Sequence, residues 1–221
     1  KSMILGLATA FEIFVLEGYR CPRELLQEDV RRIVDVGANV GYSLIYWASR
    51  FPVASIDAFE PHPKHLQILR RNLEMNRIEE RVRIHPVGVG IANGTFDLID
   101  AGAASAVTQT IDVPGRTKSG RLQVDVVDFF EAVRGAQIDL LKLDCEGAEY
   151  AIVMDPRFAN LQIGNLVMEW HATLEHPEAQ QELTRRLRDL GWKIEPGTMS
   201  NIKTLEGFGL LGAGVLWAFH E

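Results

Sequence analysis

Short apolar runs alternate with amphipathic segments along this chain of 221 residues. The runs at residues 33–37 and 55–59 are each followed by a segment whose apolar side chains recur at helical spacing, and Pro63 suits the first turn of the second helix. The apolar positions are Leu44, Ile45 and Ala48 in the first segment and Leu66, Leu69 and Leu73 in the second. Further candidate strands lie at residues 82–87, 138–143, 165–169, 192–194 and 215–219. This alternation predicts a doubly wound α/β fold, with seven strands in a mostly parallel sheet.

Two regions later in the chain depart from simple strand and helix alternation. Residues 94–124 are rich in Gly, Ala, Ser and Thr, so we expect a hairpin excursion with a mobile loop at residues 114–120. Asp125 is predicted to cap a helix that runs through Arg134. Another helix, which carries Leu183, Leu187 and Leu190, is predicted to end at Gly191.

The N-terminal stretch from Met3 to Val15 is apolar but is interrupted by Glu12. It is too short for a membrane-spanning helix, and it lacks the basic start of a signal peptide. We therefore expect residues 1–30 to form a helical segment that packs on a single domain comprising residues 31–221.

Composition narrows the choice of partners. The chain is 47% hydrophobic and 24% charged, with a net charge of -7 and a pI near 5.4. No sequence-wide basic field would attract nucleic acid or an anionic membrane, so a small-molecule partner is favoured. Cys21 and Cys145 are far apart and lack metal-type spacing, which is typical of a reducing compartment, and we expect a cytoplasmic protein. The sequence does not indicate an oligomeric state.

The clearest motif follows the first predicted strand. Asp35 ends an apolar run, and Gly37, Asn39 and Gly41 occupy the turn that opens the next helix, where glycines let a ligand lie against the backbone. A carboxylate at Asp35 would suit the ammonium of a methionine-derived cofactor, directly or through water. Glu60, at the end of the second strand, has the spacing of an acid that accepts hydrogen bonds from ribose hydroxyls.

Two other interpretations of this motif are open. In the structural one, the glycines only close a tight turn and Glu60 caps the next helix. In the other functional one, the crevice binds a nicotinamide dinucleotide. The second fits less well because the G-x-G-x-x-G pattern is absent, and Asn39 stands where the backbone would approach a pyrophosphate.

Several motifs, in this order, resemble the FkbM family of methyltransferases over residues 31–221. They are the segment from Asp35 to Gly41, the Phe59-Glu60-Pro61 step, residues 138–149 and Met168-Glu169-Trp170-His171. The resemblance implies a Rossmann-like methyltransferase fold with S-adenosylmethionine as cofactor. It also implies O-methylation of hydroxyl groups on natural products or glycans.

Site residues follow from the resemblance by position. Gly37, Asn39, Gly41, Tyr42 and Ser43 would line the methionine part of the cofactor. Glu60 would bind the ribose, and Val87 and Gly88 would border the adenine. Tyr42 and Ser43 could equally form an ordinary first helical turn, and Val87 and Gly88 could be core and turn residues.

Polar side chains follow two neighbouring strands at the predicted reaction centre. Asp144 and Glu146 come after the fourth strand, and Glu169 and His171 come at the end of the fifth. In a parallel sheet these groups converge at the C-terminal edge, although each could be a helix cap or a satisfied edge residue. Of these groups, His171 alone has an ordinary pKa near neutrality, so we expect it to act as the general base, oriented by Glu169. Asp144 would orient the acceptor hydroxyl or face the sulfonium.

Three carboxylates and an imidazole could also hold Mg²⁺ or Mn²⁺. We nevertheless expect no metal, because these residue types do not fix a coordination geometry. The sequence therefore predicts an S-adenosylmethionine-dependent O-methyltransferase for a small-molecule hydroxyl acceptor. The alternatives are an NAD(P)-dependent oxidoreductase and a noncatalytic module that binds an adenosyl ligand.

Overall fold

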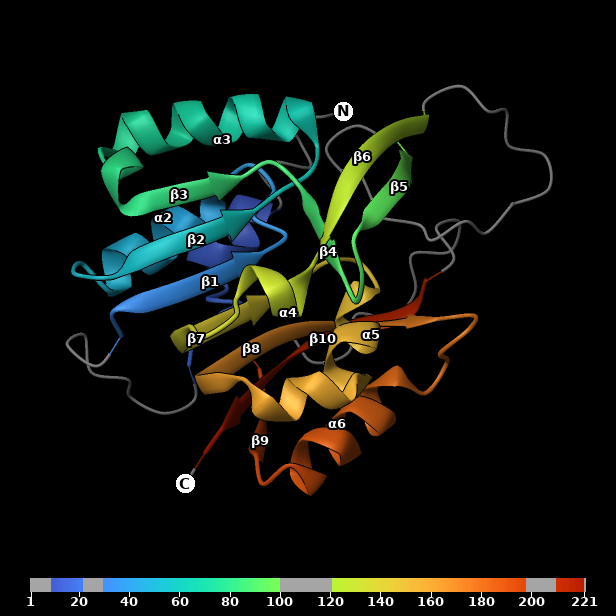
Figure 1. The fold of residues 1–221 in the computed structure, drawn as a ribbon. Helices are drawn as coiled ribbons and strands as arrows, with labels where there is room; N and C mark the ends of the chain where they lie inside the picture. Colours follow the sequence, from blue (N-terminus) through green and yellow to red (C-terminus); the bar gives the residue numbers. More distant parts are fainter. Residues whose placement is uncertain (1–8, 22–29, 100–120, 198–209, 221) are drawn as a thin grey trace.

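A seven-stranded sheet forms the centre of the molecule (Figure 1), in the order β3-β2-β1-β7-β8-β10-β9. The computed structural model describes residues 9–21, 30–99, 121–197 and 210–220. Strands β3, β2, β1, β7 and β8 are mutually parallel, whereas β10 runs antiparallel to both β8 and β9. The strands are β1 (Arg32–Val36), β2 (Ser55–Phe59), β3 (Val82–His85), β7 (Gln137–Leu143), β8 (Gln162–Thr173), β9 (Lys193–Pro196) and β10 (Leu210–Phe219). The predicted doubly wound, mostly parallel fold is confirmed.

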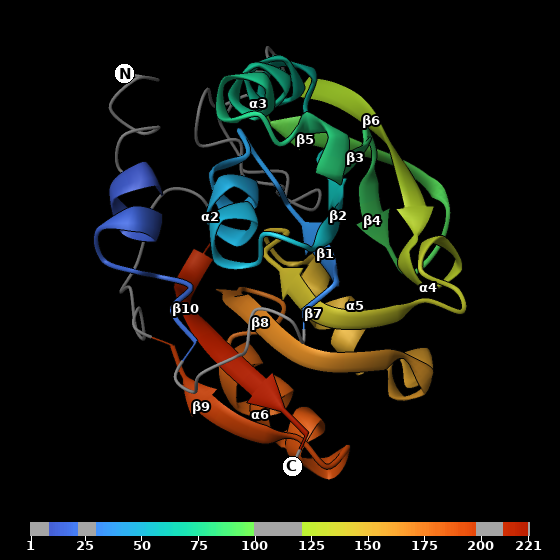
Figure 2. The same cartoon turned by 90° about the vertical axis from the view of Figure 1, so that its left-hand side faces the viewer.

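Helices cover both faces of this sheet (Figure 2), and each face has its own apolar core. One core includes the inner sides of α2 (Tyr42–Arg50) and α3 (Pro63–Asn76), and the N-terminal segment adds Ile13 and Tyr19 to it. The opposite core includes side chains of α4 (Phe129–Ala132), α5 (Ala148–Met154) and α6 (Ala179–Asp189). Two short 3-10 helices, η2 (Glu79–Arg81) and η3 (Pro156–Asn160), precede β3 and β8. Alternate side chains of an inner strand therefore enter different cores, as Leu216 and Trp217 of β10 do.

A three-stranded sheet stands beyond the carboxyl ends of the parallel strands (Figure 1), in the order β4-β6-β5. It comprises β4 (Gly88–Gly90), β5 (Gly94–Ile99) and β6 (Arg121–Asp128), and β5 and β6 form an antiparallel pair. The predicted hairpin excursion is thus confirmed. The loop predicted at residues 114–120 lies outside the described residues.

Several predicted boundaries change in the structure. Asp125 does not cap a helix, because its segment pairs with β5 and remains a strand through Asp128. The Asp128 carboxylate instead accepts hydrogen bonds from the backbone N–H groups of Phe130 and Glu131 and caps the short helix α4. Strand β3 ends at His85, so Val87 lies between β3 and β4 rather than within a strand.

Residues 9–14 of the N-terminal segment are helical, and the segment packs beside α2 (Figure 2). Phe14 makes edge contacts with Tyr42 and Tyr46, and Tyr19 stacks on Trp47 with ring centroids 5.6 Å apart. No helix among the described residues is long and apolar enough to cross a membrane.

Candidate active site

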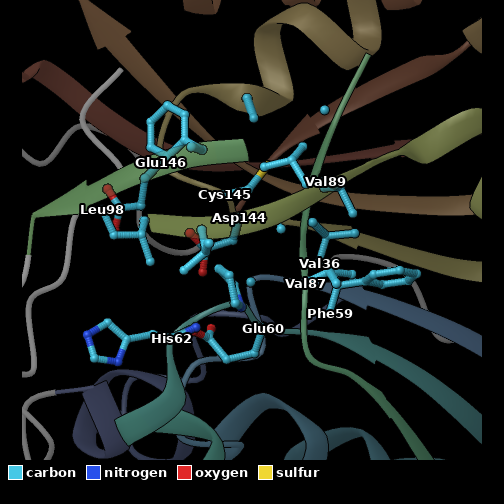
Figure 3. Close-up of a pocket in the computed structure, with 18 of the residues that line it drawn as sticks. Val36, Phe59, Glu60, His62, Val87, Val89, Leu98, Asp144, Cys145 and Glu146 are labelled. Atoms are coloured by element: carbon cyan, nitrogen blue, oxygen red, sulfur yellow. The ribbon is translucent and has the colours of Figure 1, made fainter. Parts of the chain in front are cut away.

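A cavity of about 390 Å³ lies between the carboxyl edge of the main sheet and the three-stranded sheet. Its size is in the range of small-molecule sites. In Figure 3, Glu60 and Asp144 project into the cavity from β2 and β7, while Val36, Phe59 and Val87 form an apolar side. The three-stranded sheet supplies a further apolar wall through Val89, Phe96, Leu98, Val124 and Val126.

The turn after β1 forms the floor of the cavity. Gly37, Asn39 and Gly41 have φ values of 79°, 50° and 89°, which is the left-handed region that glycine tolerates best. A Cβ atom on Gly37 would lie 1.7 Å from the carbonyl oxygen of Asp144, so no other residue fits there without moving the backbone. The turn after β1 therefore packs directly against the end of β7.

Glu60 is buried at the edge of the cavity and organises its polar rim. One carboxylate oxygen accepts a hydrogen bond from the backbone N–H of Asn39 at 2.9 Å, and the other accepts one from that of His62 at 2.8 Å. His65 Nδ1 lies 3.4 Å from Glu60 Oε1. A carboxylate has about four lone-pair sites, so these contacts leave acceptor capacity for further donors.

The structure brings some of the predicted cofactor residues to the cavity and leaves others outside its wall. Gly37, Asn39, Glu60, Val87 and Gly88 line it. Gly41 instead packs against Leu69, Tyr42 contacts Phe14, and Ser43 is buried on the inner side of α2. His62 and His65, which belong to no motif in the sequence, also line the cavity.

Asp35 is fully buried and faces a neighbouring strand rather than the cavity. Its carboxylate accepts a hydrogen bond from Trp47 Nε1 at 3.2 Å and lies 3.1 Å from the Lys142 ammonium. A direct contact with a cofactor ammonium does not fit this arrangement, because Lys142 already occupies that side of the carboxylate. The contact through water, the other form of the prediction, stays a prediction.

Lys142 joins the turn after β1 to the reaction centre. Its buried ammonium donates to the Gly37 carbonyl at 2.7 Å and lies 3.2 Å from Asp144 Oδ2. Burial alone would lower the pKa of Lys142, but the nearby carboxylates of Asp144 and Asp35 raise it above the ordinary lysine value. The side chain is therefore a permanent cation that links the two carboxylates.

His171 is held by Glu149, which was not among the predicted site residues. The Glu149 carboxylate is fully buried, and its Oε1 atom accepts from the backbone N–H of His171 at 3.1 Å and from Nδ1 at 2.8 Å. Its other oxygen accepts from the Gly147 N–H at 2.8 Å. Because the carboxylate only accepts, the proton sits on Nδ1 and Nε2 faces the cluster. Glu149 thus replaces Glu169 as the residue that orients the imidazole.

Glu146 and Glu169 face the other imidazole nitrogen, at 3.6 and 3.7 Å from Nε2. Burial, with the charge of Asp144 adding to it, raises the pKa of Glu146 to about 7 and that of Glu169 to about 8. Burial would lower the pKa of His171, but the surrounding carboxylates, Glu149 above all, raise it well above 6.5. The sequence predicted that His171 acts as a base because the ordinary histidine pKa lies near neutrality, but in the structure this pKa is raised. His171 and the neighbouring carboxylates instead titrate as one coupled group.

Asp144, Glu169 and His171 each offer one ligand atom, and these atoms lie within 4.8 Å of one another. The composition of this group suits a divalent cation. However, the Lys142 ammonium already places positive charge beside Asp144. The expectation of a metal-independent site therefore stays a prediction, with the metal as its alternative.

Three side chains of the site were not predicted from the sequence, and the sequence indicates their roles to different degrees. Lys142 interrupts the apolar second half of β7, between Leu141 and Leu143, which is an indication of a buried ion pair. Glu149 belongs to the quoted segment 138–149 but looks like an ordinary first-turn helix acid. Tyr19 reaches the site by tertiary contact alone, donating to Asp144 Oδ2 at 3.2 Å across 125 positions of sequence.

Comparisons with known proteins bear directly on this site. The sequence profile of the methyltransferase FkbM domain matches residues 35–194, which contain the cofactor turn, Glu60 and the acidic cluster. The chain belongs to the FkbM methyltransferase domain family. It is a methyltransferase, as predicted, and its cofactor is S-adenosylmethionine. The nicotinamide-dependent alternative is not supported.

Among the relatives, methyltransferase sdnD of Sordaria araneosa is 27% identical over 194 residues, which cover 73% of each chain. The AMB antimetabolite synthetase AmbE of Pseudomonas aeruginosa is 28% identical over 79% of this chain but only 10% of its own length. A crystal structure of methyltransferase FkbM from Methylobacillus flagellatus has a similar fold, with a TM-score of 0.54 and 17% identity. That alignment covers 86% of this chain and 44% of the other.

Proposed function

We propose that this methyltransferase domain transfers the methyl group of S-adenosylmethionine to a hydroxyl oxygen of a small molecule, such as a sugar or another natural product. One observation carries the proposal: the cluster of Asp144, Glu146, Glu169 and His171 adjoins the cavity, and two of its members, Asp144 and Glu146, line the cavity wall. An aliphatic hydroxyl must lose a proton as it gains a methyl group, so a proton-accepting cluster beside the cofactor cavity suits this acceptor.

The cavity suits the cofactor in size and in the chemistry of its wall. Glu60 keeps free acceptor positions at the rim, where two ribose hydroxyls would bind. The apolar walls formed by Val87 and the three-stranded sheet suit a purine ring. The close approach of Gly37 to β7 keeps this part of the wall flat, because it carries no side chain.

S-adenosylmethionine supplies an electrophilic methyl group on a sulfonium centre. The protein contributes the proton acceptor and the orientation of the hydroxyl. A positively charged group such as the sulfonium, bound beside Asp144, would lower the pKa values of Glu146, Glu169 and His171. It would do so because a nearby positive charge stabilises anionic carboxylates and disfavours the protonated, positively charged imidazole. The proton of the acceptor then passes to this cluster, with His171 held in place by Glu149.

The buried carboxylates of the site also favour this proposal over a noncatalytic binding module. Binding alone does not require groups whose pKa is raised toward neutrality, and burying several carboxylates together opposes stability. Such groups are typical of sites that transfer protons. Proton acceptance thus gives these buried carboxylates a catalytic purpose.

The test is turnover with a panel of monosaccharides, glycosides and hydroxylated polyketides, with the methylated atom identified by NMR. His171→Ala should reduce turnover about a hundredfold or more, the range of lost general-base catalysis, while cofactor binding by calorimetry stays intact. Asp144→Asn should also reduce turnover. His220→Ala is the matched control, since His220 follows β10 at the opposite sheet edge.

Methylation of nitrogen or carbon alone would overturn the assignment of an oxygen acceptor. Cofactor binding without turnover on any acceptor class would favour the noncatalytic module instead. An active His171→Ala enzyme would remove the imidazole from the chemistry and leave the carboxylates as proton acceptors.

A further inference from the structure

The N-terminal segment, residues 9–21, lies on the same face of the sheet as the reaction centre. Its buried side chains Ile13 and Tyr19 belong to the core that also contains Trp47 of α2 and Val167 of β8. Because side chains alternate along β8, Glu169 and His171 project to the same face as Val167. This segment precedes residues 35–194, the part of the chain that matches the family profile.

The Tyr19 hydroxyl makes the direct connection. It donates a hydrogen bond of 3.2 Å to Asp144 Oδ2, the same oxygen that lies 3.2 Å from the Lys142 ammonium. Among the described residues no hydrogen bond reaches Asp144 Oδ1. Two fixed donors on one oxygen therefore set the orientation of the carboxylate and leave the other oxygen for the reaction centre.

The tyrosine ring has two further neighbours, Trp47 and Lys142. It stacks on Trp47 at a centroid distance of 5.6 Å, and the Lys142 ammonium lies 5.7 Å from its centroid. Burial and the adjacent charge of Asp144 raise the pKa of Tyr19 well above its ordinary value, so the hydroxyl remains a donor. Burial and the charge of Asp144 also raise the pKa of Glu12, so a second side chain of this segment interacts electrostatically with the reaction centre.

We propose that Tyr19 is a positioning residue for methyl transfer: its hydroxyl holds Asp144 in the orientation that the reaction requires, and the N-terminal segment is thereby part of the active site. The proposal rests on the proposed function, because it assigns Asp144 a role in the transfer step. It goes beyond the family profile, since Tyr19 lies outside the matched residues.

Tyr19→Phe tests the proposal because it keeps the ring and removes only the donor. The matched control is Tyr46→Phe, since Tyr46 packs edge-on against Trp47 in the same aromatic group and no contact with Asp144 is seen. In the turnover assay with the best acceptor of the panel, Tyr19→Phe should lower kcat about tenfold, as expected for loss of a hydrogen bond to a charged group. The KM for S-adenosylmethionine should change less than twofold, and Tyr46→Phe should behave as wild type.

A double-mutant cycle with Asp144→Asn separates positioning from a general structural effect. If Tyr19 acts through Asp144, the double variant should be no slower than Asp144→Asn alone. Effects on kcat that multiply, or a Tyr19→Phe enzyme with wild-type kcat, would overturn the proposal.

The same cycle is measured in urea-unfolding free energies, which need no acceptor. If no acceptor class reacts, the proposed function fails, and with it the role in transfer. A coupling in the unfolding cycle would then show that the Tyr19–Asp144 contact exists without serving this reaction, and no coupling would show that the contact itself is wrong.

Discussion

Replacing Glu149 with glutamine isolates the buried pair that holds His171. The substitution keeps the shape of the side chain but removes its charge, and it turns one acceptor oxygen into an NH₂ group. Glu149 is fully buried and accepts from the Gly147 N–H and from two nitrogens of His171, so an amide must leave at least one of these donors without an acceptor. Breaking one side of a buried ion pair costs about 3 to 5 kcal/mol.

The sign of the pH dependence follows from His171. Its pKa in the folded protein is raised above the unfolded value, mainly because the attraction of Glu149 outweighs burial. The pair therefore stabilises the protein fully below about pH 6.5, the ordinary histidine value, and this contribution is lost as pH rises through the raised pKa. Glu149→Gln should accordingly be most destabilising near pH 6 and progressively less so at alkaline pH.

Urea unfolding followed by circular dichroism at a series of pH values gives the difference in free energy directly. Glu74→Gln on the exposed side of α3 serves as the control, and it should change stability by less than about 0.5 kcal/mol at any pH. A loss that stays constant across the pH range would show that hydrogen bonding, not the charge of His171, dominates. A negligible loss throughout would refute the buried pair altogether.

Two further predictions concern the cofactor and the metal alternative. Glu60→Ala should weaken S-adenosylmethionine binding by at least tenfold in calorimetry, as expected for the loss of about 1.5 to 3 kcal/mol. It should also lower the thermal stability of the apo protein, because the backbone N–H groups of Asn39 and His62 lose their acceptor. Wild-type affinity would contradict a ribose contact. Dialysis against a chelator should leave turnover unchanged, and added Mg²⁺ or Mn²⁺ should not raise it; abolition with rescue by a divalent ion would instead identify Asp144, Glu169 and His171 as ligands.

The fold could be predicted well because its signals are local and repeated. Short apolar runs, glycine turns and amphipathic helices predicted the seven strands of the main sheet. Boundaries were less accurate where pairing between distant segments decided them. Asp125 looks like a helix cap in isolation, but pairing with Thr95 of β5 keeps it in a strand, and the cap moves to Asp128.

The site could be predicted only in part. Glu60, Gly37 and Asp144 were found because they stand at strand ends, where parallel sheets gather ligands. Partner choice was harder, since it depends on distances that spacing does not contain. Asp35 pairs with Lys142 on the neighbouring strand, and Glu149 reaches His171 across 22 positions of sequence. The raised pKa values arise from burial of several charges together, which no single motif reveals.

The hydrogen-bonded contact between β1 and β7 fixes one distance within the active site. Asp144 N–H donates to the Val36 carbonyl at 3.1 Å, Lys142 donates to the Gly37 carbonyl, and the missing side chain of Gly37 lets the two strand ends touch. The spacing between the cofactor turn and the first carboxylate is thus a property of two adjacent backbones. Segments elsewhere in the chain can change in sequence to admit new acceptors while this spacing stays constant. A change in acceptor preference therefore need not alter the geometry of methyl transfer.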